Sequence, residues 1–251
     1  MLYHCVGGHV FNSRNKKVLD WFWQQLDKTD FELATRHAVV SLADGSFVDY
    51  PIENHLYQMP ETMRSAVLED LLAIVQKGYP VDSNFDDFLL HRFGQTLYKE
   101  YFAPYNRKIW QRSLKDVPLS WLKGKLPMPT VREIIASNIS QIKEMKMVHS
   151  TFYYPRYGGS QYMADSLAQG VHIVYDCPVN EILRRDDKWS VHGEEFDVII
   201  FCGNVKDLPL ILKKSSVSMP EVETLQYHGT TSVLCEIEAN PYSWIYMPSE
   251  K

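Results

Sequence analysis

Cysteine is scarce in this sequence and is never repeated at short spacing. The four cysteines, Cys5, Cys177, Cys202 and Cys235, form no Cys-x-x-Cys pair. Structural zinc sites and disulfide frameworks need clustered or numerous cysteines, so the sequence argues against both and favours the reducing cytoplasm. The nine histidines show no ligand spacing either, and we expect no metal site.

Long apolar runs and runs of positive charge are also missing. No window approaches the ~18 apolar residues that a membrane-spanning helix needs, and the first residues lack the apolar stretch of a signal peptide. The net charge is −5, without a cluster of lysine and arginine. We therefore expect no membrane span and no nucleic-acid partner.

Several catalytic and nucleotide-binding motifs are absent. The sequence contains no GxGxxG, GxxxxGK[ST], GxSxG or HExxH. The aspartate pairs Asp86-Asp87 and Asp186-Asp187 join adjacent residues, which diverge on a helix by ~100° and point to opposite faces of a strand. We interpret them as caps or turns rather than as an acid and base couple.

Aromatic residues, in contrast, are abundant. They make up 13% of the 251 residues, with 15 tyrosines and 6 tryptophans. Such rings fill cores, and they also line sugar and nucleotide pockets. The length allows one large domain or two small ones, each with a substantial core.

The hydrophobic pattern predicts an α/β (α+β) protein with a helical block between sheet-rich flanks. The turn at Asp44-Gly45 indicates a hairpin within 36–50. Helices are expected over 15–26, 60–77 and 130–142, and from 84 towards 102 with an interruption at Pro104. A short helix with Trp121 is expected after Pro118, and another runs from Gly158-Gly159 to Gln169. Strands are expected at 5–11, 150–155, 171–175, 179–184, 190–192, 196–202, 230–238 and 242–247.

Three glycine motifs allow close approach of a ligand to the backbone. Gly7-Gly8-His9 would let a planar ring lie on the chain, or would form an ordinary turn. Gly158-Gly159 precedes a helix, where an anion or a simple helix cap fits equally. Val179 and Gly203 belong to a strand, hairpin and strand pattern that is either a nucleotide-binding element or a plain core hairpin.

The segment Pro104–Trp110 carries no metal or nucleophile pattern. Its Tyr105, Asn106 and Trp110 could hold a base or a sugar by stacking and amide hydrogen bonds. A packing corner between helices is the alternative.

Taken in order, these segments resemble UDP-galactopyranose mutases, within the amine-oxidase-like flavoproteins. The resemblance rests on Gly7–Val10, Asp49–Asn54, Pro104–Trp110, Trp121–Pro129, Phe152–Gly159 and Trp244–Pro248. It implies an FAD cofactor and a nucleotide-sugar partner such as UDP-galactose. It also implies a redox-neutral isomerisation for surface-polysaccharide biosynthesis in the cytoplasm, in which the flavin is the nucleophile towards the sugar. A homo-oligomer is a further expectation.

The resemblance also assigns site residues and boundaries. The substrate residues are Tyr50, Glu53, Asn106, Trp110 and Tyr246; the catalytic residues are Lys125 and His9; the cofactor residues are Gly7, Gly8, His9, Gly158, Gly159, Val179 and Gly203. The implied domains are a partial FAD-binding portion at 1–50 and a helical substrate-binding subdomain at 51–148. The second half of the FAD-binding domain follows at 149–211, and a substrate-side antiparallel sheet begins within 212–251.

Some residues depart from the family pattern. Lys125 replaces an arginine, Glu53 a glutamine and Ile52 a phenylalanine, which removes a bidentate donor, an amide and a ring. Only eight residues precede His9, fewer than the ~30 of a dinucleotide-binding unit, and no counterpart of a C-terminal flavin segment follows Tyr246. Two alternatives stay open: an amine-oxidase-like FAD-dependent oxidoreductase of cell-envelope biosynthesis, and a non-catalytic nucleotide-sugar-binding relative.

Overall fold

The structure is a computed structural model that describes residues 9–122, 129–141, 150–215 and 217–249. The chain divides into two compact units. The first contains residues 1–167 together with 231–251, and the second contains residues 168–230. Each unit is described below by itself.

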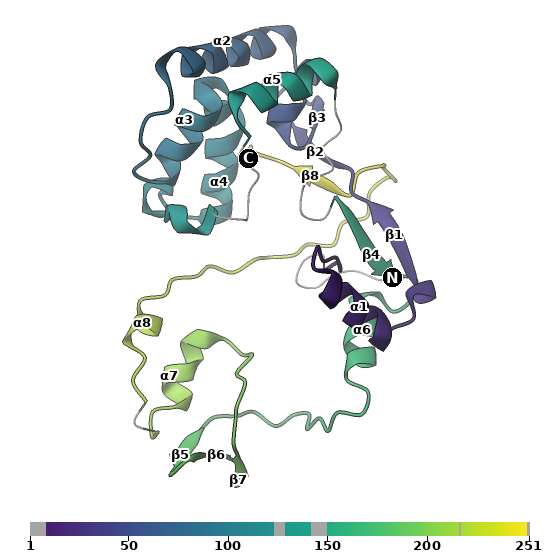
Figure 1. Cartoon of the computed structure of the whole chain (residues 1–251), viewed down its shortest axis with the longest axis vertical. Coiled ribbons are helices and arrows are strands. Elements are labelled where there is room, and N and C mark those ends of the chain that lie inside the picture. Colours follow the sequence, from purple (N-terminus) through teal and green to yellow (C-terminus); the bar gives the residue numbers. More distant parts are fainter. Residues whose placement is uncertain (1–8, 123–128, 142–149, 216, 250–251) are drawn as a thin grey trace. The chain divides into compact units, whose positions relative to one another are not determined.

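Four helices form the helical layer of the first unit (Figure 1). They are α2 (Glu61–Lys77), α3 (Phe85–Leu97), α4 (Ala103–Trp110) and α5 (Val131–Ser140). Gly78 ends α2 with a φ of 77°. Thr130 and Glu133 form a reciprocal capping box at the start of α5, which satisfies backbone N–H groups that the first turn leaves without partners. The boundaries of α2 and α5 match the predicted helices within a few residues, whereas α4 was not predicted.

The helix after Asn84 is longer and less regular than predicted. Gly94 kinks α3 with a φ of 82° and a ψ of 170°, and a π-helical turn, Tyr98–Phe102, then leads directly into α4. The expected interruption at Pro104 is wrong, because this proline lies in the first turn of α4, where its missing N–H costs nothing.

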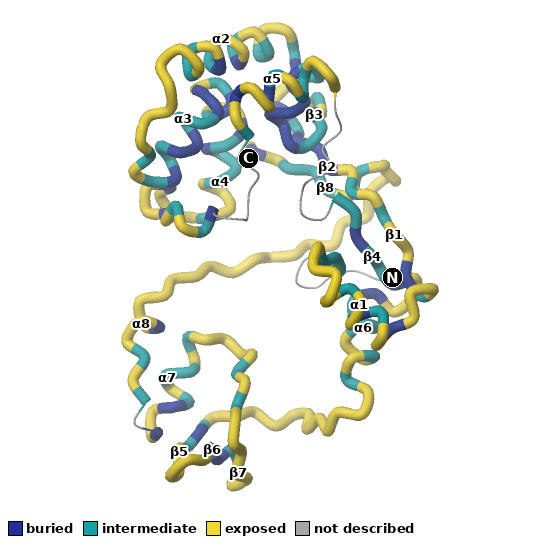
Figure 2. Tube along the Cα trace, in the orientation of Figure 1, coloured by how far each residue is buried: buried dark blue, intermediate teal, exposed yellow. Residues whose placement is uncertain are grey.

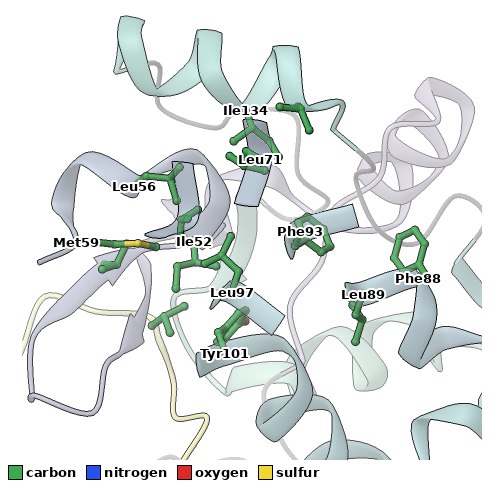
Figure 3. Close-up of a cluster of buried hydrophobic side chains, with 14 of the residues drawn as sticks. Ile52, Leu56, Met59, Leu71, Phe88, Leu89, Phe93, Leu97, Tyr101 and Ile134 are labelled. Carbon is green, nitrogen blue, oxygen red and sulfur yellow. The ribbon is translucent and has the colours of Figure 1, made fainter. Parts of the chain in front are cut away.

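The core of the first unit lies between these four helices and the hairpin predicted within 36–50 (Figure 3). Leu71 of α2, Leu97 of α3 and Ile134 of α5 have no exposed surface. Each such aliphatic side chain stabilises the fold by about 1.5–3 kcal/mol relative to exposure. This core fixes the positions of Phe88, Leu89, Phe93 and Tyr101, which also face a cavity.

A three-stranded sheet packs beside the helical layer (Figure 1). The predicted hairpin is present as β2 (Ala38–Ser41) and β3 (Phe47–Asp49), paired antiparallel. Strand β8 (Trp244–Tyr246) joins the other edge of β2 in parallel, with Val40 opposite Tyr246. Residues more than 200 positions apart in sequence thus meet. Three short 3-10 helices complete this region: Ile52–Asn54, Leu56–Gln58 and Leu119–Leu122.

A second, two-stranded sheet of the same unit pairs β1 (Phe31–Thr35) antiparallel with β4 (Thr151–Pro155). Helix α1 (Lys16–Gln25) packs here through Phe22 and Trp23, which contact Phe31. Helix α6 (Gly159–Leu167) follows β4 directly. Asn15 caps α1, since its side chain accepts from the Lys17 N–H. Of the strand predicted at 5–11, the described part contributes a bridge between Phe11 and Tyr153.

The second unit holds a small antiparallel sheet and two short helices. Strands β5 (Leu183–Arg185), β6 (Lys188–Val191) and β7 (Glu194–Phe196) pair in sequence order. The helices are α7 (Leu208–Ile211) and α8 (Pro220–Glu223). Ile182 and Leu212 are buried, and the Ile182 N–H donates to the carbonyl of Ile211 at 3.0 Å.

Several predicted strands are wrong. Residues 171–175, 198–202 and 230–238 are in no ladder, and 169–180 and 223–241 are exposed throughout (Figure 2). Val198 and Ile200 are 74% and 84% exposed. Apolar alternation specifies a strand only where a neighbouring strand covers it, and the described residues offer these segments no such neighbour.

The mixture of helices and small sheets agrees with the predicted α/β class. In the range 212–251 the described strand is β8, and it pairs in parallel rather than antiparallel. The predicted domain boundaries and the insertion of a helical subdomain remain predictions. Within the described residues, no helix has the length and apolarity to cross a bilayer.

Candidate functional site

A cavity of about 290 Å³ opens in the first unit, between the helical layer and the β2–β3–β8 sheet. Its walls come from α3, the π-helical turn, α4, the 3-10 helix at Leu119–Leu122 and β8. Most of the lining is aromatic or aliphatic: Tyr50, Phe88, Leu89, Phe93, Tyr101, Phe102, Tyr105, Ile109, Trp110, Trp121 and Tyr246.

All five substrate residues predicted from the sequence line this cavity: Tyr50, Glu53, Asn106, Trp110 and Tyr246. Each reaches it for a local reason. Asn106 and Trp110 are four residues apart on α4 and therefore share one helix face. Tyr50 follows β3, Glu53 lies in the next 3-10 helix, and β8 carries Tyr246.

Aromatic contacts fix the shape of the cavity wall. The Tyr50 and Tyr246 rings stack with centroids 4.5 Å apart, and Tyr105 meets Tyr246 edge-on at 5.4 Å. Trp110 meets Trp121 at 5.1 Å with an interplanar angle of 61°. Offset and edge-on pairs of this kind add about 0.5–1.5 kcal/mol beyond burial, so the wall is preformed.

The phenols of this wall are neutral at physiological pH. Burial raises the pKa of Tyr105 to about 12, and it also raises the pKa of Tyr50 and of Tyr101. The charges of Tyr246 and Glu53 act in the same direction on Tyr50. Neutral hydroxyl groups can donate hydrogen bonds, so the cavity offers donors and stacking surfaces together.

One acid and one amide face the cavity among these rings. The Glu53 residue is only 5% exposed, and its carbonyl accepts a hydrogen bond from Asn138 Nδ2 at 2.9 Å. The Asn106 amide donates from Nδ2 to the Phe102 carbonyl at 2.7 Å. That bond fixes the rotamer of Asn106, which lines the cavity from α4.

The sequence analysis missed Arg36, which lies directly behind the tyrosine wall. Its guanidinium donates from Nη2 to the hydroxyl of Tyr246. Its Cζ lies 4.8 Å from the ring centroid of Trp244 and 5.4 Å from that of Tyr50. No motif marks this arginine in the sequence, since its aromatic neighbour Trp244 is over 200 residues away.

No family model matches the chain. Among solved structures it resembles the crystal structure of reduced UDP-galactopyranose mutase, with a TM-score of 0.71 and 19% identity. The match covers 84% of this chain and 47% of that one, so the chain spans about half the length of the mutase. The chain has a mutase-like fold. At this identity the likeness extends to the fold alone.

Three of the predicted cofactor residues lie together in the first unit of this mutase-like fold. Gly158 and Gly159 have φ values of 69° and 60° at the start of α6, and Ser160 Oγ donates to the His9 carbonyl at 3.0 Å. A Cβ on Gly159 would lie 3.3 Å from Tyr154 Oη. This turn therefore needs glycine for both its backbone angles and its packing.

The remaining predicted residues lie elsewhere. Val179 and Gly203 belong to the second unit. Gly7, Gly8 and Lys125 lie outside the described residues. Within the described part of the chain, no group of three His, Cys, Asp or Glu side chains is placed to hold a metal ion.

Proposed function

We propose that this chain is the nucleotide-sugar-binding part of a UDP-galactopyranose-mutase-like flavoprotein, an isomerase of surface-polysaccharide biosynthesis. One observation carries the proposal: the five residues that the sequence assigns to the substrate line a single cavity. They come from three separate stretches of the chain, 50–53, 106–110 and 246, so sequence proximity alone does not bring them together.

The chemistry of the cavity suits a uridine nucleotide. Its volume of about 290 Å³ is close to the lower end of ligand sites, about 300 Å³. The Trp110 and Trp121 rings offer a surface on which a flat base stacks, which contributes about 1–3 kcal/mol per base. Tyr246 offers a hydroxyl group to the phosphates, and the segment of Tyr50 resembles the one that reaches the uridine in the mutases.

The described part of the proposed cofactor site fits a flavin. The Gly158-Gly159 turn stands at the start of α6, whose N-terminal N–H groups favour an anion there. His9 adjoins this turn through the Ser160 bond. We propose that these residues contact FAD; when bound, the reduced flavin supplies the nucleophile for the anomeric carbon of the sugar.

Glu53 favours a second candidate. A buried carboxylate in the cavity repels a diphosphate and attracts a cation or a donor-rich substrate. An amine-oxidase-like FAD-dependent oxidoreductase of cell-envelope biosynthesis would use it in that way. A relative that binds a nucleotide sugar without catalysis is the third candidate.

A titration of tryptophan fluorescence with UDP tests the proposal, because Trp110 and Trp121 both line the cavity. We expect a saturable change with UDP and a much weaker response to ADP or sulfate. Equal responses to all three anions, or none, would reject the uridine-nucleotide site. Retention of FAD absorbance through gel filtration then separates the flavin enzymes from the non-catalytic relative.

A further inference from the structure

Helix α2 is apolar on its outer side as well as on the side that faces the core. Val67 and Leu71 have no exposed surface, and Ile74 packs against the same core cluster. On the outer side, Leu68 and Leu72 are 40% and 55% exposed. A surface helix ordinarily has one apolar stripe and a polar outer face, and a helix that is apolar all round is buried. The composition of α2 is therefore that of a helix covered on both sides.

The exposed apolar residues of α2 follow the spacing of a coiled-coil seam. Leu68, Leu72 and Val75 are separated by four and then three positions, and Ser65 stands three positions before Leu68. Alternate steps of three and four place side chains along one line of a helix, the a and d positions of a heptad. Val75 is 61% exposed. The line thus runs over the solvent side of α2, whose outer side Figure 2 shows as exposed.

This apolar face lies apart from the candidate functional site. The described residues that line the cavity come from other elements, and α2 forms an outer edge of the helical layer (Figure 1). The apolar surface continues past the end of the helix at Tyr79 and Val81, which are both exposed. Single exposed apolar residues are common, whereas a continuous series of them marks an interaction surface.

Two oppositely charged residues border the apolar stripe. With Leu68 at a d position and Leu72 at an a position, Arg64 takes a g position and Glu69 an e position. Arg64 donates from Nη1 to the neutral carbonyl of Tyr57 at 3.4 Å. Glu69 is exposed, and it takes part in none of the ion pairs between residues that the structure describes. Coiled-coil helices form ion pairs with their partners at these two positions.

The spacing of these charges is complementary to itself in one orientation. In a parallel pair a g residue faces the e residue five positions further on in the partner helix, so Arg64 of each copy meets Glu69 of the other. An antiparallel pair about the helix centre brings the two Glu69 side chains together instead, because position 69 is the midpoint of α2. Opposite charges across an interface favour its register and like charges disfavour it. The charges therefore favour a parallel pair of two copies.

A membrane surface suits this face less well. Amphipathic helices that lie on anionic membranes carry lysine and arginine along their polar side. In α2 the residues beside the stripe include Glu61 and Glu69, and the whole chain has a net charge of −5. An anionic membrane would repel such a helix, whereas a second copy of the chain offers both the apolar residues and the matching charges.

We propose that two copies of this chain associate through α2 in parallel, with Leu68, Leu72 and Val75 in the seam and two Arg64–Glu69 ion pairs at its edges. The helix has 17 residues and is about 26 Å long. A single pair of helices of this length buries less than the ~1,200 Å² of a standard interface, so the association depends on concentration rather than being obligate. The association is independent of which ligand the cavity binds.

Sedimentation velocity over a series of protein concentrations up to about 200 μM tests the association. We expect the wild type to form more dimer as its concentration rises. Leu72→Glu buries a charge in the seam and should weaken the association at least about 10-fold. Lys77→Gln is the matched control, because it changes the net charge by the same amount at an exposed position away from the stripe, and it should leave the association unchanged.

Charge reversal tests the parallel register, even if Leu72→Glu fails to fold. Arg64→Glu and Glu69→Arg each turn two attractive pairs into two repulsive ones, so each should weaken the dimer about 4-fold to 30-fold. The double variant restores both pairs and should recover most of the affinity.

Three results would overturn the inference. The first is a wild type that stays monomeric, including one that floats with phosphatidylserine vesicles and so uses the face on a membrane. The second is a dimer that Leu72→Glu leaves unchanged. The third is a double variant that associates no better than either reversal alone. The UDP titration of Leu72→Glu should match that of the wild type, so the proposed function stands or fails separately.

Discussion

At the scale of single residues, Trp110 gives the clearest expectation for ligand binding. It is partly buried, lies on α4 and meets Trp121 edge-on at the cavity wall. Replacing it by alanine removes a stacking surface that contributes about 1–3 kcal/mol to binding a base. We expect Trp110→Ala to weaken UDP binding about 5-fold to 150-fold, measured by calorimetric titration.

Leu97→Ala is the matched control for Trp110→Ala. Leu97 is fully buried in the core of the same unit, so its truncation should cost about 2–5 kcal/mol of unfolding free energy. Trp110→Ala should cost clearly less than the ~3–5 kcal/mol of a core tryptophan. If Trp110→Ala lowered the unfolding free energy by about 3–5 kcal/mol and left the UDP affinity unchanged, Trp110 would belong to the core rather than to a binding site.

For Glu53 we expect the opposite effect, a substitution that strengthens UDP binding. It places a buried carboxylate where the family pattern has a glutamine, so Glu53→Gln removes a charge that repels a diphosphate. For a like charge about 10 Å away, at an effective dielectric of about 20–40, the repulsion is about 0.8–1.7 kcal/mol. We expect UDP affinity to rise about 4-fold to 15-fold in Glu53→Gln, with uridine affinity unchanged. Tighter uridine binding by the same factor would point to packing rather than to charge.

The residue scale also shows what sequence reasoning reached at the site. Local sequence motifs mark four of the cavity residues: Tyr50, Asn106, Trp110 and Tyr246. The structure brings these four to one cavity. Arg36 stands in no motif, and its contacts with the wall depend on strand β8 lying beside β2. A parallel pairing between distant segments has no local signature, so this neighbour of the wall was not predictable.

At the scale of elements, the kink at Gly94 shapes the cavity. Gly94 has a φ of 82° and a ψ of 170°, a backbone region that only glycine occupies without strain. A Cβ there would lie 2.5 Å from Asp70 Cβ, and Asp70 Oδ2 accepts from the Thr96 N–H at 2.6 Å just after the kink. The kink thus lies inside α3, between Phe93, which lines the cavity, and the π-helical turn that carries Tyr101 and Phe102.

We expect Gly94→Ala to destabilise the protein by roughly 2–4 kcal/mol, through backbone strain and overpacking against α2. Urea unfolding measures this. Gln95→Ala, at the next position, is the control and should change the unfolding free energy by less than about 0.5 kcal/mol if the position tolerates surface substitution. A Gly94→Ala variant as stable as the wild type would mean that the kink relaxes without cost.

The elements differ in how far the sequence determines them. Helices α1, α2 and α5 carry their own caps at Asn15, Gly78 and Thr130, and the hairpin carries its turn at Asp44-Gly45. Such signals are local, and the helices and the hairpin that they bound were predicted. The strands expected at 171–175, 198–202 and 230–238 depend on neighbouring strands, which the described residues do not provide.

At the scale of the whole molecule, the buried tyrosines predict how stability depends on pH. The pKa of Tyr50, Tyr101 and Tyr105 is raised, first of all by burial, above about 10 for an unfolded tyrosine. Above pH 10 the unfolded chain therefore releases protons that the folded chain keeps. The folded state then binds more protons, and the free energy of unfolding falls as pH rises from about 10 towards 12.

Urea unfolding between pH 8 and pH 11 measures this dependence. We expect little contribution from these tyrosines below pH 9 and a decline above pH 10. Tyr101→Phe is the control, because it removes one of the titrating groups and should make the decline shallower. An identical slope in Tyr101→Phe and in the wild type would contradict the account of these phenols.

The central claim concerns the whole cavity: five residues from distant segments bind one uridine nucleotide. Hydrogen exchange with and without UDP tests it most directly, since it reports every segment at once. We predict slower exchange at 50–54, 98–110, 119–122 and 244–247, and unchanged exchange in β5, β6 and β7. Protection confined to other segments, or none at saturating UDP, would contradict the claim.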